Sequence, residues 1–149
     1  SKSANDHQIT MQLFGIKEII YANRPMIEEL IYNLCDNAIR YNNPGGKVSI
    51  TITNDIEFVY LIVKDDGIGI SKEHQERIFE RFYRVDKSRS KSTGGTGLGL
   101  AIVKHILAQH QTQMELVSEL GKGTEIKILF QREIQKMQEP LKKLTEKKK

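Results

Sequence analysis

Two asparagines, Asn33 and Asn37, lie four residues apart in a segment with helical periodicity, so they fall on one face of the predicted helix. Asparagine is unfavourable inside a helix because its amide competes for backbone hydrogen bonds. Solvent-facing polar residues are one interpretation of the pair. The other is a cation and phosphate site, because amide oxygens suit a hydrated Mg²⁺ ion that also binds phosphate. Arg40 and Tyr41 extend this face with a cation for phosphate and a ring that packs on a nucleotide.

A second candidate follows residues 57–64, an apolar segment predicted to be a central strand. Asp65, Gly67 and Gly69 come at alternate positions directly after it. A carboxylate at the end of a strand can accept a hydrogen bond from an amine, and glycines remove side chains that would keep a flat ring from the backbone. The same residues also suit an ordinary strand-to-helix turn, so both interpretations stay open.

Four glycines, Gly94, Gly95, Gly97 and Gly99, end a polar segment and precede an apolar helical one. Glycines let the backbone approach a ligand, and a helix start directs unpaired N–H groups and a positive dipole end at an anion. This combination is typical of phosphate binding but also of linkers. The polar segment is either a solvated loop or a lid whose cations reach bound phosphates, and those cations are Arg84, Lys87, Arg89 and Lys91.

Several other chemistries are excluded. The four histidines and the single Cys35 have no metal-ligand spacing, and no Ser–His–Asp set is indicated. The phosphate loop Gly-x-x-x-x-Gly-Lys-[Ser/Thr] is absent, which excludes that class of NTPase. One cysteine rules out an internal disulfide and fits a reducing compartment, and its place in an apolar helical pattern predicts a buried, inert thiol.

Periodicity predicts the elements that position these residues. A helix is expected over residues 26–41, with a core stripe of Ile27, Ile31, Leu34 and Ala38. Two short strand candidates separated by Gly15 indicate a hairpin-like start. The strands are expected at residues 9–14, 18–21, 47–53, 57–64, 114–118 and 124–130, and further helices after Ser71 and over about 97–109. This order predicts an α+β fold: a two-layer α/β sandwich with a mixed sheet of about five strands packed on about three helices.

The chain has 149 residues, which fits one domain with a core of its own. Its net charge of +4 belongs to residues 131–149, which carry seven Lys/Arg and three Asp/Glu. We therefore expect a catalytic domain over residues 1–130, a basic flexible tail over 131–149, and no nucleic-acid partner. No apolar run approaches the roughly 20 residues of a membrane span and no signal peptide is visible, so we expect a soluble fragment.

Taken together, these motifs resemble those of the catalytic, ATP-binding domain of bacterial sensor histidine kinases, in the superfamily that includes gyrase B and the heat-shock and mismatch-repair ATPases. Five motifs come in the family's order along the chain. They are an asparagine box at residues 33–41, a first glycine box at 65–70, a phenylalanine box at 78–86, a second glycine box at 95–100 and a final glycine-threonine motif at 121–124. One departure is visible, since the family often has His-Gly-Gly where this chain has His110-Gln111-Thr112.

The resemblance implies a role for each matching residue. Asn33 and Asn37 would hold Mg²⁺ and the phosphates of ATP, and with Arg40 they would form the catalytic set. Asp65 would accept a hydrogen bond from the adenine amine, with Thr124 nearby. The other residues expected to bind the cofactor are Tyr41, Gly67, Gly69, Ile70, Arg84, Gly95, Thr96, Gly97, Leu98, Gly99 and Leu100.

The resemblance further implies transfer of the ATP γ-phosphoryl group to a histidine on a separate dimerisation domain, because no histidine here has the family's acceptor context. A response regulator receiver domain would act downstream. The isolated domain would be a monomer on the cytoplasmic side, and the full protein a membrane-anchored homodimer. Two alternatives remain: an ATP-driven conformational switch of the gyrase or chaperone type, in which a glutamate replaces Asn33, and a degenerate binding module without catalysis.

Overall fold

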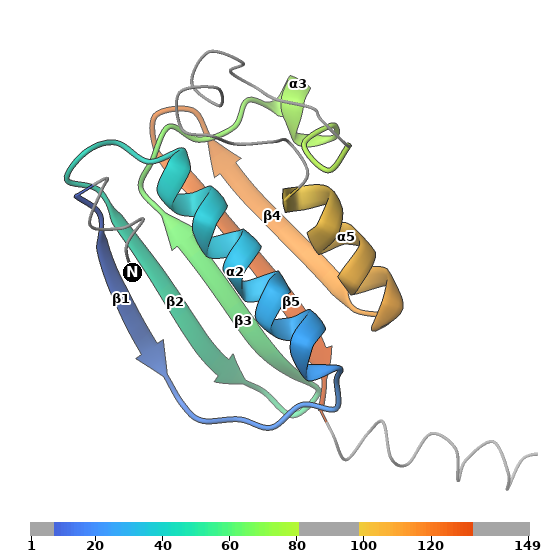
Figure 1. Ribbon diagram of the computed structural model, residues 1–149. Helices are drawn as coiled ribbons and strands as arrows, with labels where there is room; N and C mark the ends of the chain where they lie inside the picture. The colour runs from blue at the N-terminus through green and yellow to red at the C-terminus, as the bar shows by residue number, and fades with distance from the viewer. Residues whose placement is uncertain (1–7, 81–98, 133–149) are drawn as a thin grey trace, which may run out of the picture.

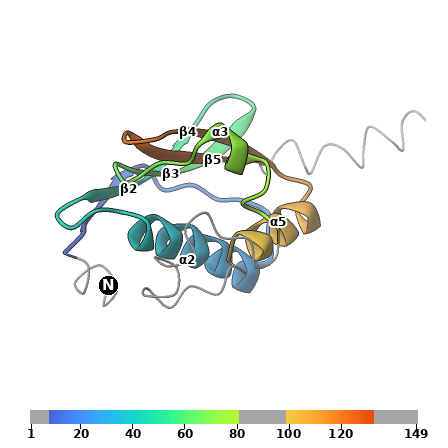
Figure 2. The same cartoon turned by 90° about the horizontal axis from the view of Figure 1, so that it is seen from above.

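The computed structural model describes residues 8–80 and 99–132, which form a sheet covered by helices on one face (Figures 1 and 2). Most of the predicted basic tail and most of the predicted lid lie outside these residues. The strands are β1 (Thr10–Gly15), β2 (Lys47–Asn54), β3 (Phe58–Asp65), β4 (Gln113–Glu119) and β5 (Gly123–Gln131). The helices are α2 (Arg24–Arg40), α3 (Lys72–Gln75) and α5 (Gly99–Gln109). No helix in the described ranges is long and apolar enough to cross a membrane.

The predicted fold class is confirmed. The sheet has the order β1-β2-β3-β5-β4. It is mixed, because β1 and β2 are parallel while every other neighbouring pair is antiparallel. The apolar strand β3 lies at the centre, as predicted, and its alternate residues Val59, Leu61 and Val63 are buried in the main core.

The start of the chain differs from the prediction. Residues 18–21 are not a strand and form no hairpin with β1, which pairs with β2 instead. Parallel neighbours need a long crossover, and α2 provides it. Gly15 ends β1 with φ +103°, where a Cβ would lie 2.0 Å from the Ile52 carbonyl oxygen. This left-handed backbone takes the chain off the sheet, so residues 16–23 connect β1 to α2 rather than return along it.

The start of α2 has the signals expected of a helix N-terminus. Asn23 is the N-cap, and its Oδ1 accepts a hydrogen bond from the Met26 N–H at 3.0 Å. Pro25 occupies the first turn, where its missing N–H is not needed. The helix therefore begins two residues before the start that apolar periodicity predicted.

The buried face of α2 is wider than predicted. Leu34 and Ala38 are buried as expected, whereas Ile27 and Ile31 are only half-buried. Leu30 and Ile39 are buried although the predicted stripe omitted them. The reason is that α2 packs on β2 and β3 and also on α5, so two sides of the helix are covered rather than one.

Cys35 on α2 is half-buried rather than buried. Burial, together with the nearby Asp36 charge, raises the pKa of its thiol above 9.0. The thiol therefore stays protonated at neutral pH, and a protonated thiol is a poor nucleophile. This agrees with the predicted inert role.

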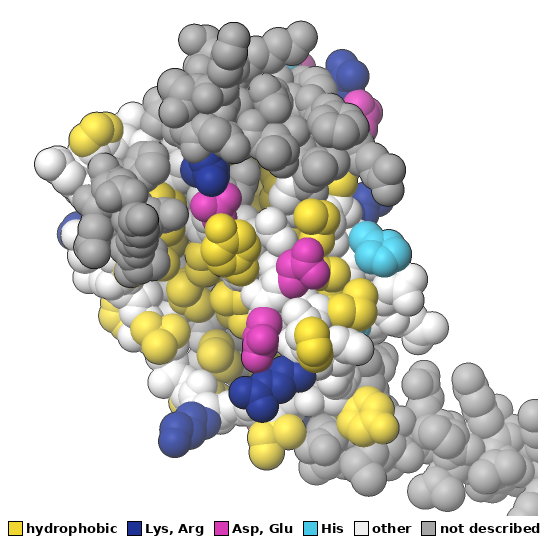
Figure 3. All heavy atoms as spheres, in the orientation of Figure 1, with side chains coloured by type: hydrophobic (Ala, Val, Ile, Leu, Met, Phe, Trp, Pro, Cys, Tyr) yellow, Lys and Arg dark blue, Asp and Glu magenta, His cyan; other side chains and the backbone are white. Residues whose placement is uncertain are grey.

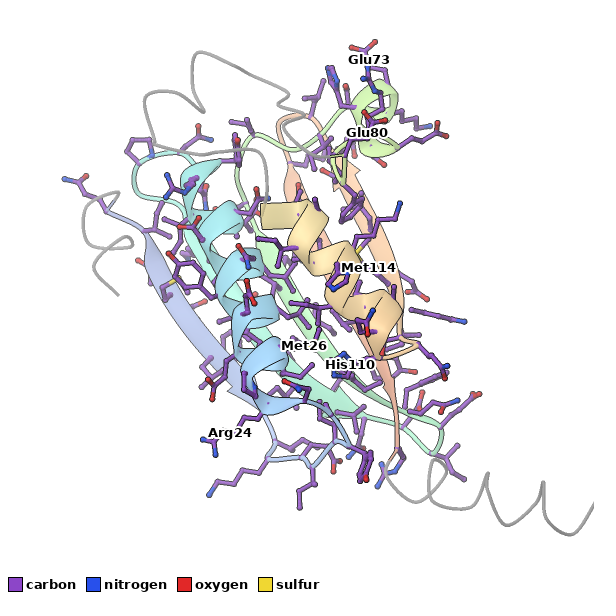
Figure 4. All side chains as sticks on the ribbon, turned by 45° about the vertical axis from the view of Figure 1, so that its right-hand side comes forward. Arg24, Met26, Glu73, Glu80, His110 and Met114 are labelled. Carbon is purple, nitrogen blue, oxygen red and sulfur yellow. The ribbon has the colours of Figure 1, made fainter. Side chains whose placement is uncertain are left out.

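The helix predicted after Ser71 is short. Ser71 is the N-cap position of α3, but its side chain makes no capping hydrogen bond, and its buried Oγ has no partner among the described residues. Ile78 lies beyond the helix end and is buried, while Glu73 and Glu80 project away from the sheet (Figure 4). The helical turn is therefore positioned by packing rather than by its cap.

The β1 edge is less well covered by helices than the centre of the sheet. Leu13 is paired with Ile50, on the face that carries the helices, yet it is 75% exposed. Tyr32 on α2 is also exposed, and Figure 3 shows hydrophobic side chains at the surface over β1 and α2. The core therefore lies between the central strands and the pair of helices, away from this edge.

His110 joins the end of α5 to the start of α2. Its Nδ1 lies 2.8 Å from the Ile106 carbonyl oxygen, and its Nε2 accepts a hydrogen bond from the Asn23 N–H at 3.0 Å. Because Nε2 accepts, Nδ1 carries the proton and donates to the carbonyl. These two contacts fix the end of the helix layer opposite the predicted site.

Gln111 lies in the left-handed conformation that favours glycine. Its φ is 50°, and it is the first residue after the α5 cap. The Gln111 and Thr112 N–H groups donate to the carbonyl oxygens of Ala108 and Leu107, at 3.2 and 3.0 Å. This is the Schellman arrangement that usually has glycine at this position. The departure from His-Gly-Gly thus keeps the turn geometry but places a side chain in a strained backbone.

We predict that Gln111→Gly raises the free energy of unfolding by about 0.5–1 kcal/mol. The left-handed backbone costs a residue with a Cβ about 1–2 kcal/mol, and the extra entropy of an unfolded glycine offsets part of that gain. Chemical denaturation measures the change. Gln111→Val is the matched control and should lower stability, because a β-branched residue is disfavoured at φ 50°. Equal stability of the two variants would contradict the prediction.

Candidate functional site

The candidate residues meet at one end of the sheet, where β3 and α2 end and the β4–β5 turn lies (Figure 1). Backbone hydrogen bonds join these parts. The Ile68 N–H donates to the Tyr41 carbonyl oxygen at 3.2 Å, and the Gly121 N–H donates to the Ile68 carbonyl oxygen at 2.9 Å. Residues distant in sequence, at 41, 68 and 121, are therefore held in one place.

Asp65 ends β3 as a half-buried carboxylate. It accepts a hydrogen bond from the Gly67 N–H at 2.9 Å and another from the Thr124 N–H. Burial raises the pKa of Asp65 from 3.8 to about 6, against the lowering effect of these two bonds. At neutral pH the group is still a carboxylate, so it presents a charged acceptor with no proton of its own.

Gly67 and Gly69 allow the backbone to pack closely. A Cβ at Gly67 would lie 2.5 Å from the Tyr41 carbonyl oxygen. One at Gly69, where φ is +74°, would lie 2.0 Å from the Glu119 carbonyl oxygen. Both glycines are therefore required by the contacts that the loop makes with the end of α2 and the end of β4, in addition to any approach of a ligand.

Ser118 on β4 connects that strand to β5 and to the loop after β3, and it was not identified from the sequence. Its Oγ accepts a hydrogen bond from the Ile70 N–H at 2.8 Å, donates to the Gly123 carbonyl oxygen at 3.0 Å and lies 2.7 Å from Oγ1 of Thr124. One signal was available, because Ser118 takes the place of an apolar residue in the alternation with Met114 and Leu116. A polar side chain on the core face of a strand needs hydrogen-bond partners.

Asn33 lies on α2 against the first residue of α5. Its Nδ2 donates to the Glu29 carbonyl oxygen at 2.8 Å. A Cβ added at Gly99 would lie 3.2 Å from its Oδ1, so the amide oxygen faces the start of α5. Leu100 follows in the first turn of that helix and packs against the core. The second glycine box thus touches the asparagine box, at Gly99.

Asn37 is half-buried one turn further along α2, and its side chain makes no hydrogen bond within the described part of the chain. Arg40 is held by Asp36: its Nε lies 2.7 Å from Oδ2 of Asp36, and both side chains are at most 23% exposed. A half-buried ion pair fixes the direction of the guanidinium. Arg40, the predicted phosphate ligand, therefore has a fixed side-chain direction at the end of the helix.

Asn42 fixes the position of the loop after α2. It is 2% exposed. Its Nδ2 donates to the Lys47 carbonyl oxygen at 3.1 Å and to Oδ1 of Asp66 at 3.2 Å. The same Asp66 oxygen accepts the Lys47 N–H at 2.7 Å. This cluster ties α2 to the start of β2 and to the residue after Asp65.

The described candidates form two groups joined by α2. Asp65, Gly67, Gly69, Ile70 and Thr124 lie around the end of β3, next to Tyr41. Asn33, Asn37 and Arg40 lie along the helix, and Asn33 meets Gly99. Eight residues separate positions 33 and 41, about 12 Å along a helix axis. Arg84, Gly95, Thr96, Gly97 and Leu98 lie outside the described residues.

No group of three or more His, Cys, Asp or Glu side chains that could hold a metal ion occurs in the two described segments. A cation here would therefore rely on amide oxygens and on the ligand itself, as Mg²⁺ commonly does. The Asn33 amide fits this role, because its nitrogen is occupied by the Glu29 carbonyl and its oxygen is the atom left to bind.

A family comparison covers most of the chain. The Histidine kinase-, DNA gyrase B-, and HSP90-like ATPase family matches residues 22–134, which include all the candidate residues. Two curated relatives are the sensor histidine kinase RppB of Synechocystis sp., 47% identical over 104 residues, and the sensor-like histidine kinase SenX3 of Mycolicibacterium smegmatis, 48% identical over 105 residues. Each match covers 70% of this chain but only 23% and 27% of those proteins, so the chain spans about a quarter of their length.

Solved structures give the same result. The mycobacterial sensor histidine kinase MprB has a TM-score of 0.74 and 25% identity, with 87% of each chain covered. The nucleotide-free catalytic domain of the histidine kinase ThkA has a TM-score of 0.73 and 25% identity, covering 88% of this chain and 84% of that one. Full-length ShkA in complex with AMPPNP has a TM-score of 0.73 and 27% identity, covering 87% of this chain and 27% of that one.

We predict that Asp65→Asn raises the free energy of unfolding at pH 7 by about 1 kcal/mol. The folded pKa of about 6 lies above the usual 3.8, so the folded state holds an extra proton between these values. Stability from this group is thus present at low pH and lost as pH rises through about 6. The asparagine should remove that loss, and urea unfolding at pH 4.5 and pH 7 measures it. A variant less stable than wild type at pH 7 would contradict the prediction.

Proposed function

This chain belongs to the Histidine kinase-, DNA gyrase B-, and HSP90-like ATPase family, and we propose that it is the ATP-binding catalytic domain of a sensor histidine kinase. It donates the γ-phosphoryl group of ATP to a histidine on a dimerisation domain outside this chain. A response regulator then receives the phosphoryl group. Within the full protein the domain lies on the cytoplasmic side of a membrane-anchored homodimer.

One observation carries this proposal: a charged acceptor and two side-chain amides are arranged along the length of α2, with the acceptor at one end of the site and the amides toward the other. The Asp65 carboxylate, with its two N–H donors, stands at one end. Asn33, in contact with the start of α5, stands at the other. The interval of about 12 Å along α2 suits an extended nucleoside triphosphate, with adenine at Asp65 and the phosphates near Asn33.

Adenine binding follows from the chemistry of Asp65. A carboxylate without a proton accepts a hydrogen bond from the exocyclic amine of adenine. Thr124 contributes a neighbouring hydroxyl from the adjacent strand. Tyr41, at the end of α2 and bonded through its carbonyl to Ile68, forms the side of the pocket.

Phosphate binding rests on α2 and on the start of α5. Asn33 and Asn37 hold Mg²⁺ and phosphate oxygens, because their half-buried amides face the side of α2 that Gly99 approaches. Bound Mg²⁺ neutralises charge on the phosphates. Arg40 adds a cation whose direction is set by Asp36. Phosphoryl transfer needs mostly positioning and charge neutralisation, and these residues supply both.

Hydrolysis has no evident base among these residues. In gyrase-like relatives a glutamate activates water at the position that Asn33 occupies here. Glu29, one turn earlier, is exposed, and its backbone carbonyl is engaged by Asn33. An amide cannot take a proton from water, so ATP is kept for transfer rather than hydrolysis.

The acceptor histidine is supplied by another domain. His110 is held between Ile106 and Asn23 at the far end of the helix layer, and His74 lies beside Glu73. His105 is exposed on α5, six residues after Gly99. A conformational switch of the gyrase or chaperone type is the second candidate, and Asn33 in place of glutamate weighs against it.

We predict that Asn37→Ala weakens ATP binding at least tenfold in the presence of Mg²⁺ and reduces the Mg²⁺ dependence. Asn37 is one of the two amides proposed to hold Mg²⁺, and its loss leaves Asn33 alone in that role. Isothermal titration with and without Mg²⁺ measures the effect. Tyr32→Ala, on the exposed side of the same helix, is the control and should bind like wild type. Unchanged affinity of Asn37→Ala would contradict the site.

Phosphotransfer tests the function itself. Labelled ATP, this domain and a separately expressed acceptor domain should give a labelled histidine, and Asn37→Ala should not. Binding of ATP without any transfer to the acceptor would favour the switch instead.

We also predict that ATP affinity falls about tenfold between pH 7 and pH 5. The pKa of Asp65 is about 6, and its protonated form loses the charge that attracts the adenine amine. Titration of the ATP phosphates affects wild type and Asp65→Asn alike, so the difference between their pH profiles isolates Asp65. Parallel profiles would mean that this carboxyl does not contact the nucleotide.

A further inference from the structure

Three side chains form a row across the helix-bearing face of the sheet. Asp65 on β3 pairs with Thr124 on β5, and Thr124 pairs with Ser118 on β4. Directly paired residues have their Cβ atoms about 4.5–5.5 Å apart, so each side chain reaches the next. All three are half-buried. Thr124 therefore lies between Ser118 and the Asp65 carboxylate, and Ser118 contacts Thr124.

The protons of this row can be counted. A serine hydroxyl has one proton to donate and two lone pairs to accept. The geometry has Ser118 Oγ donating to the Gly123 carbonyl oxygen at 3.0 Å and accepting the Ile70 N–H at 2.8 Å. Its remaining contact is Thr124 Oγ1 at 2.7 Å. Either hydroxyl can donate in that bond; with the Ser118 proton on the Gly123 carbonyl oxygen, Thr124 is the donor.

We infer that Ser118 is a specificity-determining residue: it takes the Thr124 proton and leaves that hydroxyl as an acceptor toward the purine ring. The inference rests on the proposed function, since it concerns the adenine end of that site. Thr124 and Asp65 then present two acceptors side by side. A 6-amino purine offers the donor that they need, while a 6-oxo purine offers a carbonyl that neither can bind.

Gln75 keeps Ser118 in this role. Its Nε2 donates to the Ile70 carbonyl oxygen at 2.7 Å and to the Ser118 carbonyl oxygen at 3.2 Å. Ile70 is therefore tied to β4 through its N–H, by Ser118, and through its carbonyl, by Gln75. The Ser118 side chain cannot turn away without leaving the Ile70 N–H unpaired, so its Oγ is held beside Oγ1 of Thr124.

A purely structural role for Ser118 would have a different consequence. If the hydroxyl only ties the loop at residues 66–70 to β4, its loss should weaken every nucleotide equally. If it sets the direction of the Thr124 proton, its loss frees that hydroxyl to donate to a carbonyl, and discrimination between purines falls. The ratio of two affinities separates these cases, because a general loosening cancels in it.

The experiment measures the dissociation constants of ATP and inosine triphosphate, which differ at the purine C6 group, by isothermal titration at pH 7.5. Wild type should prefer ATP by at least about a hundredfold, because a site built to bind an N–H group rejects an analogue that lacks it. Ser118→Ala should lower that preference about tenfold. Ser118→Thr keeps the hydroxyl and should retain it. Ser49→Ala, a half-buried serine on the opposite face of β2, is the matched control and should also retain it.

A double-variant cycle completes the test and does not depend on the stability of Ser118→Ala alone. Thr124→Val removes the acceptor itself and should lower the preference to the same extent. Combining it with Ser118→Ala should add nothing further, because the two residues act in series. An unchanged ratio in Ser118→Ala, or additive effects in the double variant, would overturn the inference. Wild type that bound no ATP would instead contradict the proposed function.

Discussion

The site depends on keeping a carboxylate ionised while it is half-buried at the end of the central strand. Burial raises the pKa of Asp65 to about 6, and the hydrogen bonds from the Gly67 and Thr124 N–H groups oppose that rise. Those two donors come from a loop and from a strand more than fifty residues later in the chain. The loop must therefore turn tightly, and β5 must lie directly beside β3, for the acceptor to exist.

The glycine boxes serve this packing as much as they serve a ligand. Gly67 and Gly69 let the loop touch the backbone of α2 and β4, and Gly123 lets β5 pass the Asp65 carbonyl oxygen, where a Cβ would lie 2.0 Å away. Asn42 and Asp66 lock the opposite side of the same loop. A site built from backbone contacts holds its acceptors in fixed directions, which suits a pocket that must recognise one small polar group.

The other end of the site is built from side chains along α2. Asn33 bonds to the Glu29 carbonyl oxygen and Arg40 to the Asp36 carboxylate, both within the helix. Each bond fixes the direction of the side-chain group that remains to bind a ligand. Because α2 is packed on two sides and cannot bend freely, it sets the distance between these α2 side chains and Asp65. The proposed adenine and phosphate ends can then be tuned separately while their spacing stays constant.

The sequence by itself predicted the fold class and most of the elements, and it singled out candidate residues that the structure brings close together. Periodicity locates α2 and the strands, because core-facing positions repeat at fixed intervals. The asparagines and Asp65 stand out because their types are unusual at such positions. Tertiary structure alone decided the parallel pairing of β1, the broad burial of α2, and the roles of Ser118 and Asn42. The physical reason is that these features are contacts between segments distant in the chain: a serine in a strand carries no local sign that its hydroxyl will meet a threonine hydroxyl and a loop N–H.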